Sequence, residues 1–221
     1  MTQTRPPGAG TLLLAGTGER LGTAVARRFH EAGWSVALVA RSGDIVDPLA
    51  SDLDRAVALR GDVTDADDID RIVAETRAMF GSVDCLVCNA SAGGGAPVGE
   101  ATPASFERVW RIRALGSFLL VRACLEDLQA NGTVLFSGTT YASEPAVEQV
   151  EWASGAAATR GFAETLAAGD LNATYIEIAA ALRPPDSNFP GAIGVDTVAN
   201  RYLTLAESDD PPGLIRIDPP E

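Results

Sequence analysis

The order of apolar segments along this chain predicts an α/β fold, a doubly wound parallel sheet with helices on both faces. Short, continuously apolar runs such as 11–15 and 35–40 alternate with stretches of helical periodicity such as 66–80. A strand that is apolar on both sides must be covered on both faces, which is typical of parallel sheets. The 221 residues suit one large domain. We therefore expect a single domain over 11–221 after a flexible stretch at 1–10.

Each expected element has a local reason. Residues 11–15 are apolar and end in a glycine turn, and residues 20–32 place Leu21, Val25 and Phe29 on one helical face. Acidic and threonine side chains at 62–65 can cap the helix over 66–80, and Pro103 suits the first turn of a long helix over 102–129. The other strands are expected at 35–40, 56–60, 83–88, 132–137, 174–179 and 214–217, and the other helices at 147–168 and 196–206.

The charge of the chain narrows its partners. Seventeen basic and thirty acidic residues leave a net charge of −13, which repels nucleic acid and anionic membrane surfaces. We therefore expect a small-molecule ligand, with no nucleic acid and no membrane as partner. No apolar run approaches the ~20 residues of a membrane span, and residues 1–10 lack a signal-peptide core, so a cytoplasmic protein is expected.

The absence of lysine and the positions of the cysteines exclude further kinds of catalytic and metal-binding chemistry. All basic residues are arginine, because the chain contains no lysine, and a mechanism that needs an ammonium or a Schiff base is excluded. Cys85 and Cys88 form a C-x-x-C within an expected strand, where residues three apart point to opposite faces and cannot share a metal. We expect buried, free thiols and no metal site.

A glycine-rich turn follows the first strand and opens the first helix. At that position bare backbone can approach a pyrophosphate at the positive end of the helix. The turn therefore indicates nucleotide binding, although a merely tight turn is the alternative. The residues of the turn expected to contact the nucleotide are Gly16, Gly18, Arg20, Leu21 and Gly22.

Arg41 bears on which nucleotide binds. It follows the second strand, where an acidic residue would accept a ribose 2′-hydroxyl, whereas an arginine can pair with a 2′-phosphate. NADP is therefore favoured over NAD. A solvated loop arginine is the alternative interpretation.

Several landmarks in the same order resemble the short-chain dehydrogenase/reductase family over residues 11 to about 218. Gly16 and Gly22 match the outer glycines of its T-G-x-x-x-G-x-G turn. Asp62 and Val63 look like its adenine-contacting segment, and Asn89-Ala90 is similar to the core of its N-N-A-G motif. The resemblance implies a Rossmann-like domain and cofactor contacts at Asp62, Val63, Asn89 and Ala90.

The resemblance fails at the catalytic positions. The family uses a tyrosine and a lysine four residues later, with a supporting serine and asparagine; here Trp152, Ala156, Thr139 and Arg113 occupy those places. An indole N–H donates a hydrogen bond but exchanges no proton near neutral pH, so Trp152 cannot act as the general acid. Loss of that group typically forfeits ~10²–10⁴ in rate. Tyr141 is the nearest replacement acid by sequence, or else an aromatic residue of the same cleft.

The sequence departs from the family's pattern at two further places. Arg20 stands where the middle glycine of the turn is expected and either clashes with the pyrophosphate or swings outward to pair with a phosphate. The substrate loop is shorter than in the family, between 181 and 194, and 183–194 is expected to be flexible.

Three functions remain open. The first, which we favour, is a pseudoenzyme that keeps the fold and binds a nucleotide or small molecule, or acts as a partner subunit. The second is a repurposed cyclase, lyase or isomerase whose pocket contains Thr139, Tyr141, Trp152 and Arg113. The third is an NADP-dependent oxidoreductase with relocated catalytic groups. A homodimer or homotetramer through helices 102–129 and 147–168 is expected, because small residues such as Gly155 and Gly161 permit close helix approach.

Overall fold

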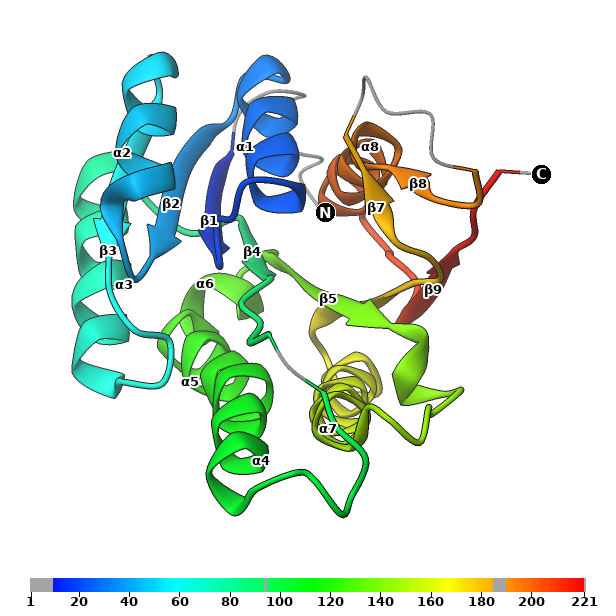
Figure 1. Cartoon of the computed structure of the whole chain (residues 1–221). Coiled ribbons are helices and arrows are strands. Elements are labelled where there is room, and N and C mark those ends of the chain that lie inside the picture. The colour runs from blue at the N-terminus through cyan, green and yellow to red at the C-terminus, as the bar shows by residue number, and fades with distance from the viewer. Residues whose placement is uncertain (1–9, 94, 185–189, 221) are drawn as a thin grey trace.

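A parallel sheet of seven strands runs through the described residues of the computed structural model, 10–93, 95–184 and 190–220, with helices on both faces (Figure 1). The strand order is β3-β2-β1-β4-β5-β6-β9, which confirms the doubly wound α/β class. The strands are β1 (Thr11–Ala15), β2 (Ser35–Ala40), β3 (Ala56–Arg60), β4 (Cys85–Cys88), β5 (Thr133–Thr139), β6 (Asn172–Ile178) and β9 (Leu214–Ile217). The α-helices are α1 (Leu21–Glu31), α2 (Gly43–Asp52), α3 (Ala66–Phe80), α4 (Pro103–Trp110), α5 (Gly116–Ala123), α6 (Leu125–Gln129), α7 (Val150–Ala167) and α8 (Val195–Ala206).

The strand order reverses between β1 and β4. From β1 the chain moves outward to β3 on one side, then returns to build β4, β5, β6 and β9 on the other. β1 and β4 pair in register from Leu12 with Cys85 to Ala15 with Cys88. In such sheets ligands bind outside the carboxyl ends of the strands at this reversal. The fold therefore places a candidate site just after Ala15 and Cys88.

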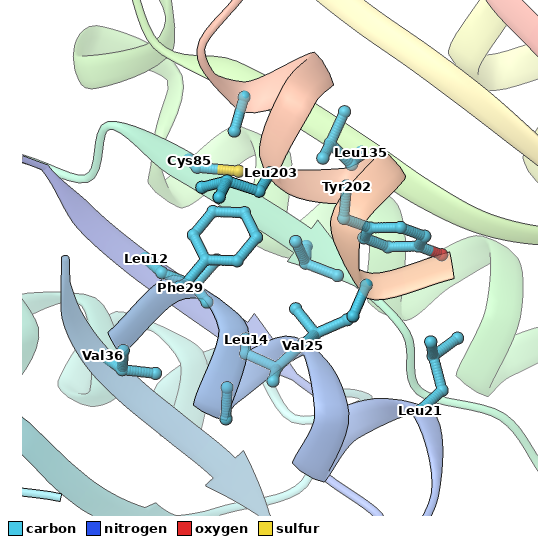
Figure 2. Packing of buried hydrophobic residues seen from close by; sticks show 14 of the residues in the cluster. Leu12, Leu14, Leu21, Val25, Phe29, Val36, Cys85, Leu135, Tyr202 and Leu203 are labelled. Carbon is cyan, nitrogen blue, oxygen red and sulfur yellow. The ribbon is translucent and has the colours of Figure 1, made fainter. Parts of the chain in front are cut away.

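The core lies on both faces of the sheet because alternate residues of each strand point in opposite directions. Leu12 and Leu14 pack on the face covered by α1 and α8, whereas Leu13 and Ala15 belong to the core on the other face. Figure 2 shows the first face, where Phe29 of α1 lies among Leu12, Cys85 and Leu203. This arrangement holds the amino-terminal end of α1 at the carboxyl end of β1.

The cysteines follow the same alternation. Cys85 and Cys88 are buried in the cores on opposite faces of the sheet, and Cys124 is buried in the same core as Cys88. All are free thiols. Burial raises the pKa of Cys124 to about 12, so this thiol stays protonated at neutral pH. The expected strand geometry and the absence of a disulfide framework are confirmed.

The helix expected over 102–129 is not continuous, and that prediction was wrong. α4 ends at Trp110, and the π-helical segment η1 (Arg111–Leu115) follows, in which the Gly116 N–H donates to the Arg111 carbonyl. The Arg113 carbonyl accepts from the hydroxyls of Ser117 (2.6 Å) and Thr159 (3.2 Å). These side-chain donors tie η1 to α5, which bears Ser117, and to α7, which bears Thr159.

The segment 183–194, which was expected to be flexible, begins within one short strand and ends within another. β7 (Leu182–Arg183) and β8 (Ile193–Gly194) form a small parallel pair apart from the main sheet. Residues 185–189 of that segment, and residues 1–9 of the expected flexible terminus, lie outside the described residues. In the described part of the chain, no helix has the length and apolar character needed to cross a membrane.

Candidate functional site

The glycine turn after β1 is held against the ends of both neighbouring strands. Gly16 and Thr17 donate their backbone N–H groups to the Val39 carbonyl at 3.0 and 2.9 Å, and the Asn89 side chain donates to the Gly16 carbonyl at 2.7 Å. Gly16 has φ +97°, and an added Cβ would lie 2.3 Å from the Ala90 backbone nitrogen. Only glycine fits here, since the turn combines a left-handed conformation with close backbone approach.

The rest of the turn divides into an open part and a packed part. Gly18 is exposed, with open space where a Cβ would be, whereas Gly22 packs on the backbone of Thr17 and Leu21 is buried. Arg20 is exposed and supplies no side-chain cap to α1.

A pocket of about 680 Å³ opens at the reversal point, within the usual size range of ligand sites. It brings together most of the predicted cofactor contacts, but Arg20, Leu21 and Gly22 are not part of its wall. The lining residues are Gly16, Thr17, Gly18, Val39, Ala40, Arg41, Ser42, Ile45, Gly61, Asp62, Val63, Asn89, Ala90, Ser91 and Ile112.

Charged groups in the wall differ in how far they are already paired. Arg41 is exposed, and no acidic side chain of the described residues pairs with it, whereas neighbouring Arg60 is bound by Asp47. The Asp62 carboxylate accepts from both the backbone N–H and the hydroxyl of Thr64, each at 2.8 Å. Asp62 is therefore held in one orientation, while the guanidinium of Arg41 is available to a ligand.

The four predicted catalytic-pocket residues come from separate elements and do not line this pocket. Thr139 ends β5, Tyr141 lies in the short 3₁₀ turn η2 (Thr140–Ala142), Trp152 lies on α7 and Arg113 in η1. The Tyr141 and Trp152 rings meet edge to face at 6.3 Å, and the Arg113 Cζ lies 5.0 Å from the Trp152 ring centroid. Tyr141, Trp152 and Arg113 thus form one stack, whereas the Thr139 side chain is not in it.

The indole N–H of Trp152 is already engaged. It donates to the carbonyl of Ala92 at 2.9 Å. Ala92 belongs to the loop between β4 and α4, so the bond ties α7 to the wall beside Asn89 and Ser91. A donor that is used within the protein is not free to orient a ligand carbonyl. This contact was not predictable from the position of Trp152 alone.

Arg113 is buried without a neutralising partner. Its side chain is among the buried charged residues, with 7% of the residue exposed. Nη1 lies 3.5 Å from the Ser91 hydroxyl, at the limit of a hydrogen bond, and Nε is buried with no hydrogen-bond partner. Burial lowers the pKa of Arg113. No carboxylate of the described residues forms an ion pair with it.

α7 is shaped to receive this side chain. A Cβ added at Gly155 would lie 3.2 Å from the Arg113 Cδ, so the aliphatic part of Arg113 crosses α7 where the side chain is missing. Ala156, one turn after Trp152 on the same helix face, is also buried. Gly155 does permit the close approach of other helical segments, but these are segments of the same chain, since Arg113 of η1 and Val109 of α4 pack there.

A buried glutamate that the sequence did not single out fixes the loop above this stack. Glu151 accepts from the Ala96 N–H at 2.9 Å and from the Ser105 hydroxyl at 2.8 Å. The hydrogen bond from Ser105 lowers the pKa of Glu151. The carboxylate joins α7 to α4 and to the loop that bears Ala92. In the sequence, the only sign of this role of Glu151 is that an acidic residue stands on the apolar side of a helix, next to Trp152.

Comparison with known proteins settles the family. The model of the family described as short chain dehydrogenase matches residues 11–185. The chain belongs to this family. Versicolorin reductase 1 of Dothistroma septosporum is 26% identical over 202 residues, which cover 86% of this chain and 73% of that protein.

Solved structures of this short-chain dehydrogenase family have the same fold as the chain. The alcohol dehydrogenase from Thermococcus sibiricus, complexed with 5-hydroxy-NADP, has a TM-score of 0.86 at 20% identity, covering 95% of this chain and 96% of that one. L-sorbose reductase from Gluconobacter frateurii, complexed with NADPH and L-sorbose, has a TM-score of 0.86 at 20% identity, covering 96% and 97%.

Proposed function

We propose that this short-chain dehydrogenase homologue binds NADP(H) and does not carry out ordinary carbonyl–alcohol hydride transfer. The observation that carries the proposal is the engagement of the Trp152 indole N–H by the Ala92 carbonyl. We align Trp152, Ala156 and Arg113 with the tyrosine, lysine and asparagine of the family. The bound cofactor would supply a hydride, but this alignment leaves no group at the aligned position that could deliver the accompanying proton.

Dinucleotide binding is supported by the wall of the pocket. Gly18 leaves the backbone open at the amino-terminal end of α1, where the N–H groups of the first helical turn would stabilise a pyrophosphate. Asp62 and Val63 would border the adenine, Asn89 and Ala90 the inner ribose. Among its structural neighbours, the alcohol dehydrogenase and the L-sorbose reductase were solved with 5-hydroxy-NADP and NADPH, and a 3-ketoacyl-(acyl-carrier-protein) reductase from Brucella melitensis with NADH.

Two other hydroxyl-bearing residues, Thr139 and Tyr141, make contacts within the protein. The Thr139 backbone is held by the Tyr175 hydroxyl, which donates to its carbonyl at 3.3 Å. Tyr141 packs edge-on against Trp152 and has no basic residue of the described part of the chain paired with it.

The proposal is tested by titrating the purified chain with NADPH while nicotinamide fluorescence is followed, then adding a panel of ketones and aldehydes. We expect saturable binding, and NADPH consumption no faster than in protein-free buffer. Absence of binding contradicts the cofactor half of the proposal, and rapid consumption contradicts the catalytic half.

Arg41 is expected to set the preference for NADPH. Arg41→Ser removes a guanidinium that can pair with the 2′-phosphate, a charge-assisted bond of about 1.5–3 kcal/mol, so NADPH affinity falls about 10–100-fold. NADH affinity stays within about twofold, because NADH lacks that phosphate. Arg27→Ser is the matched control, since Arg27 is an arginine of α1 paired with Asp52. Equal loss for both cofactors would show that Arg41 acts on the fold.

We further propose that a second copy of the chain packs on α4, α5 and α6. These helices expose large apolar side chains, Phe106, Trp110, Phe118 and Leu125, of which Phe118 is 45% exposed. Phe118→Glu is expected to convert the homodimer or homotetramer into a monomer in light scattering, because it places a charge in an apolar interface. Met79→Glu on α3, at a residue 59% exposed, is the control. A monomeric parent protein contradicts the proposal.

A further inference from the structure

The buried guanidinium of Arg113 is the least satisfied charge among the described residues outside the cofactor pocket. Of its nitrogens, Nε has no hydrogen-bond partner, and Nη1 reaches only the Ser91 hydroxyl at 3.5 Å. The Trp152 ring contacts the guanidinium, with 5.0 Å between Cζ and the ring centroid. A cation–π contact compensates only part of the cost of removing a charge from water.

The acidic groups on the surrounding elements are occupied elsewhere. Glu151, on α7 next to Trp152, accepts from Ala96 and Ser105. Glu177 of β6 pairs with Arg216 at 3.1 Å and lies 3.6 Å from Arg160. Neither forms an ion pair with Arg113. A buried arginine normally has a carboxylate or phosphate partner, and the described residues supply none to Arg113.

The backbone around Arg113 holds it in place for such a ligand. The π segment η1 turns the residue toward α7, and the hydroxyls of Ser117 and Thr159 bind its carbonyl. Gly155 leaves room for its side chain. π segments of this kind occur frequently at functional sites. Ser91, the hydroxyl nearest to Nη1, also lines the pocket, so the guanidinium lies next to the pocket's Ser91–Ile112 end.

We propose that Arg113, together with Ser91, binds a carboxylate group of a small organic ligand at that end of the pocket. A carboxylate is planar and matches a pair of parallel guanidinium donors in a two-bond contact, and Nε, which has no hydrogen-bond partner, forms such a pair with Nη2. The inference rests on the proposed function, because the ligand shares the pocket with the cofactor. It adds the chemical class of that ligand. Ser91 follows β4 and Arg41 follows β2, with β1 between these strands in the sheet, so the site is separate from the 2′-phosphate contact.

The experiment titrates the cofactor-free protein with sodium benzoate and sodium formate by calorimetry, against sodium chloride at the same ionic strength and inorganic phosphate. We expect a carboxylate to bind at one site per chain, and Arg113→Gln to weaken it at least tenfold. Arg111→Gln is the matched control, because Arg111 is an exposed arginine of the same π segment. Binding of phosphate but of no carboxylate, or equal carboxylate binding by Arg113→Gln, would overturn the proposal.

Stability provides a second readout. If Arg113 awaits a ligand, Arg113→Gln without ligand melts at the parent temperature or higher, because it removes an unpaired buried charge. The carboxylate then raises the melting temperature of the parent but not that of the variant. A clear fall in the melting temperature of the unliganded variant would assign Arg113 a structural role and contradict the proposal. NADPH binding and ketone turnover are measured separately, so failure of the proposed function is seen independently.

Discussion

Replacing Trp152 by tyrosine, Ala156 by lysine and Arg113 by asparagine in one variant is expected to raise NADPH-dependent ketone reduction at least about 10²-fold above the double variant W152Y/A156K. General acid catalysis by a positioned group contributes ~10²–10⁴ in rate, which sets the size of the gain. The double variant itself is expected to stay near the rate of the parent.

The geometry explains why two substitutions do not suffice. Arg113 packs on the Trp152 ring and crosses α7 at Gly155, the residue before Ala156. A lysine at the buried position 156 would place an ammonium in the same enclosed space as the guanidinium, and two like charges there oppose each other. Arg113→Asn removes that charge and the side chain that fills the space.

The parent, the double variant and the triple variant are compared by their initial rates with NADPH and a panel of ketones. The melting temperature of each protein is measured as well, so that a loss of stability is not taken for a loss of activity. The single variant Ala156→Lys serves as the control, since it adds the ammonium without a phenol. A double variant that already reduces ketones at rates typical of reductases would show that Arg113 does not obstruct the site.

Gly16→Ala is expected to lower NADPH affinity at least about 100-fold, or about 2.7 kcal/mol, and to destabilise the fold. The added Cβ would lie 2.3 Å from the Ala90 nitrogen and 2.6 Å from the Asn89 carbonyl carbon, which are backbone atoms that cannot move aside as a flexible side chain could. The φ of +97° adds strain of about 1–3 kcal/mol for a residue with a side chain. Urea unfolding and nicotinamide fluorescence measure the two effects.

Gly18→Ala tests the same turn without the clash, because its Cβ meets open space and its φ is not left-handed. We expect it to leave the free energy of unfolding nearly unchanged. A similar loss of stability at both glycines would contradict the role assigned to the close approach between Gly16 and Ala90.

The sheet was predictable because its strands are short, apolar on both sides and separated by helical patterns. Thr11–Ala15, Ser35–Ala40 and Leu214–Ile217 lie where the sequence predicts them, since turn residues mark their ends. The helical stretch over 102–129 has nearly the predicted extent, but its interruptions were missed, because apolar periodicity does not report the one extra residue in the π turn of η1. The β7–β8 pair was missed, since two-residue strands have no periodicity.

The candidate site was predictable as a set of positions but not as an arrangement. The glycine turn and the residues at the ends of β2 and β4 do meet in one pocket, as parallel strands require. The stack of Arg113 on Trp152 depends on contacts between η1 and α7, which no local pattern reveals. Gly155 was interpreted as an interface residue because its small size was visible in the sequence, whereas the neighbour that fills its space was not.

The most direct measurement is the rate of NADPH oxidation by the pure chain, with bound NADPH demonstrated in the same sample and a broad ketone panel present. With the indole of Trp152 bonded to Ala92 and a methyl group at position 156, we predict saturable NADPH binding and oxidation indistinguishable from the protein-free rate. Steady ketone reduction that scales with protein concentration and disappears in Gly16→Ala would contradict this account.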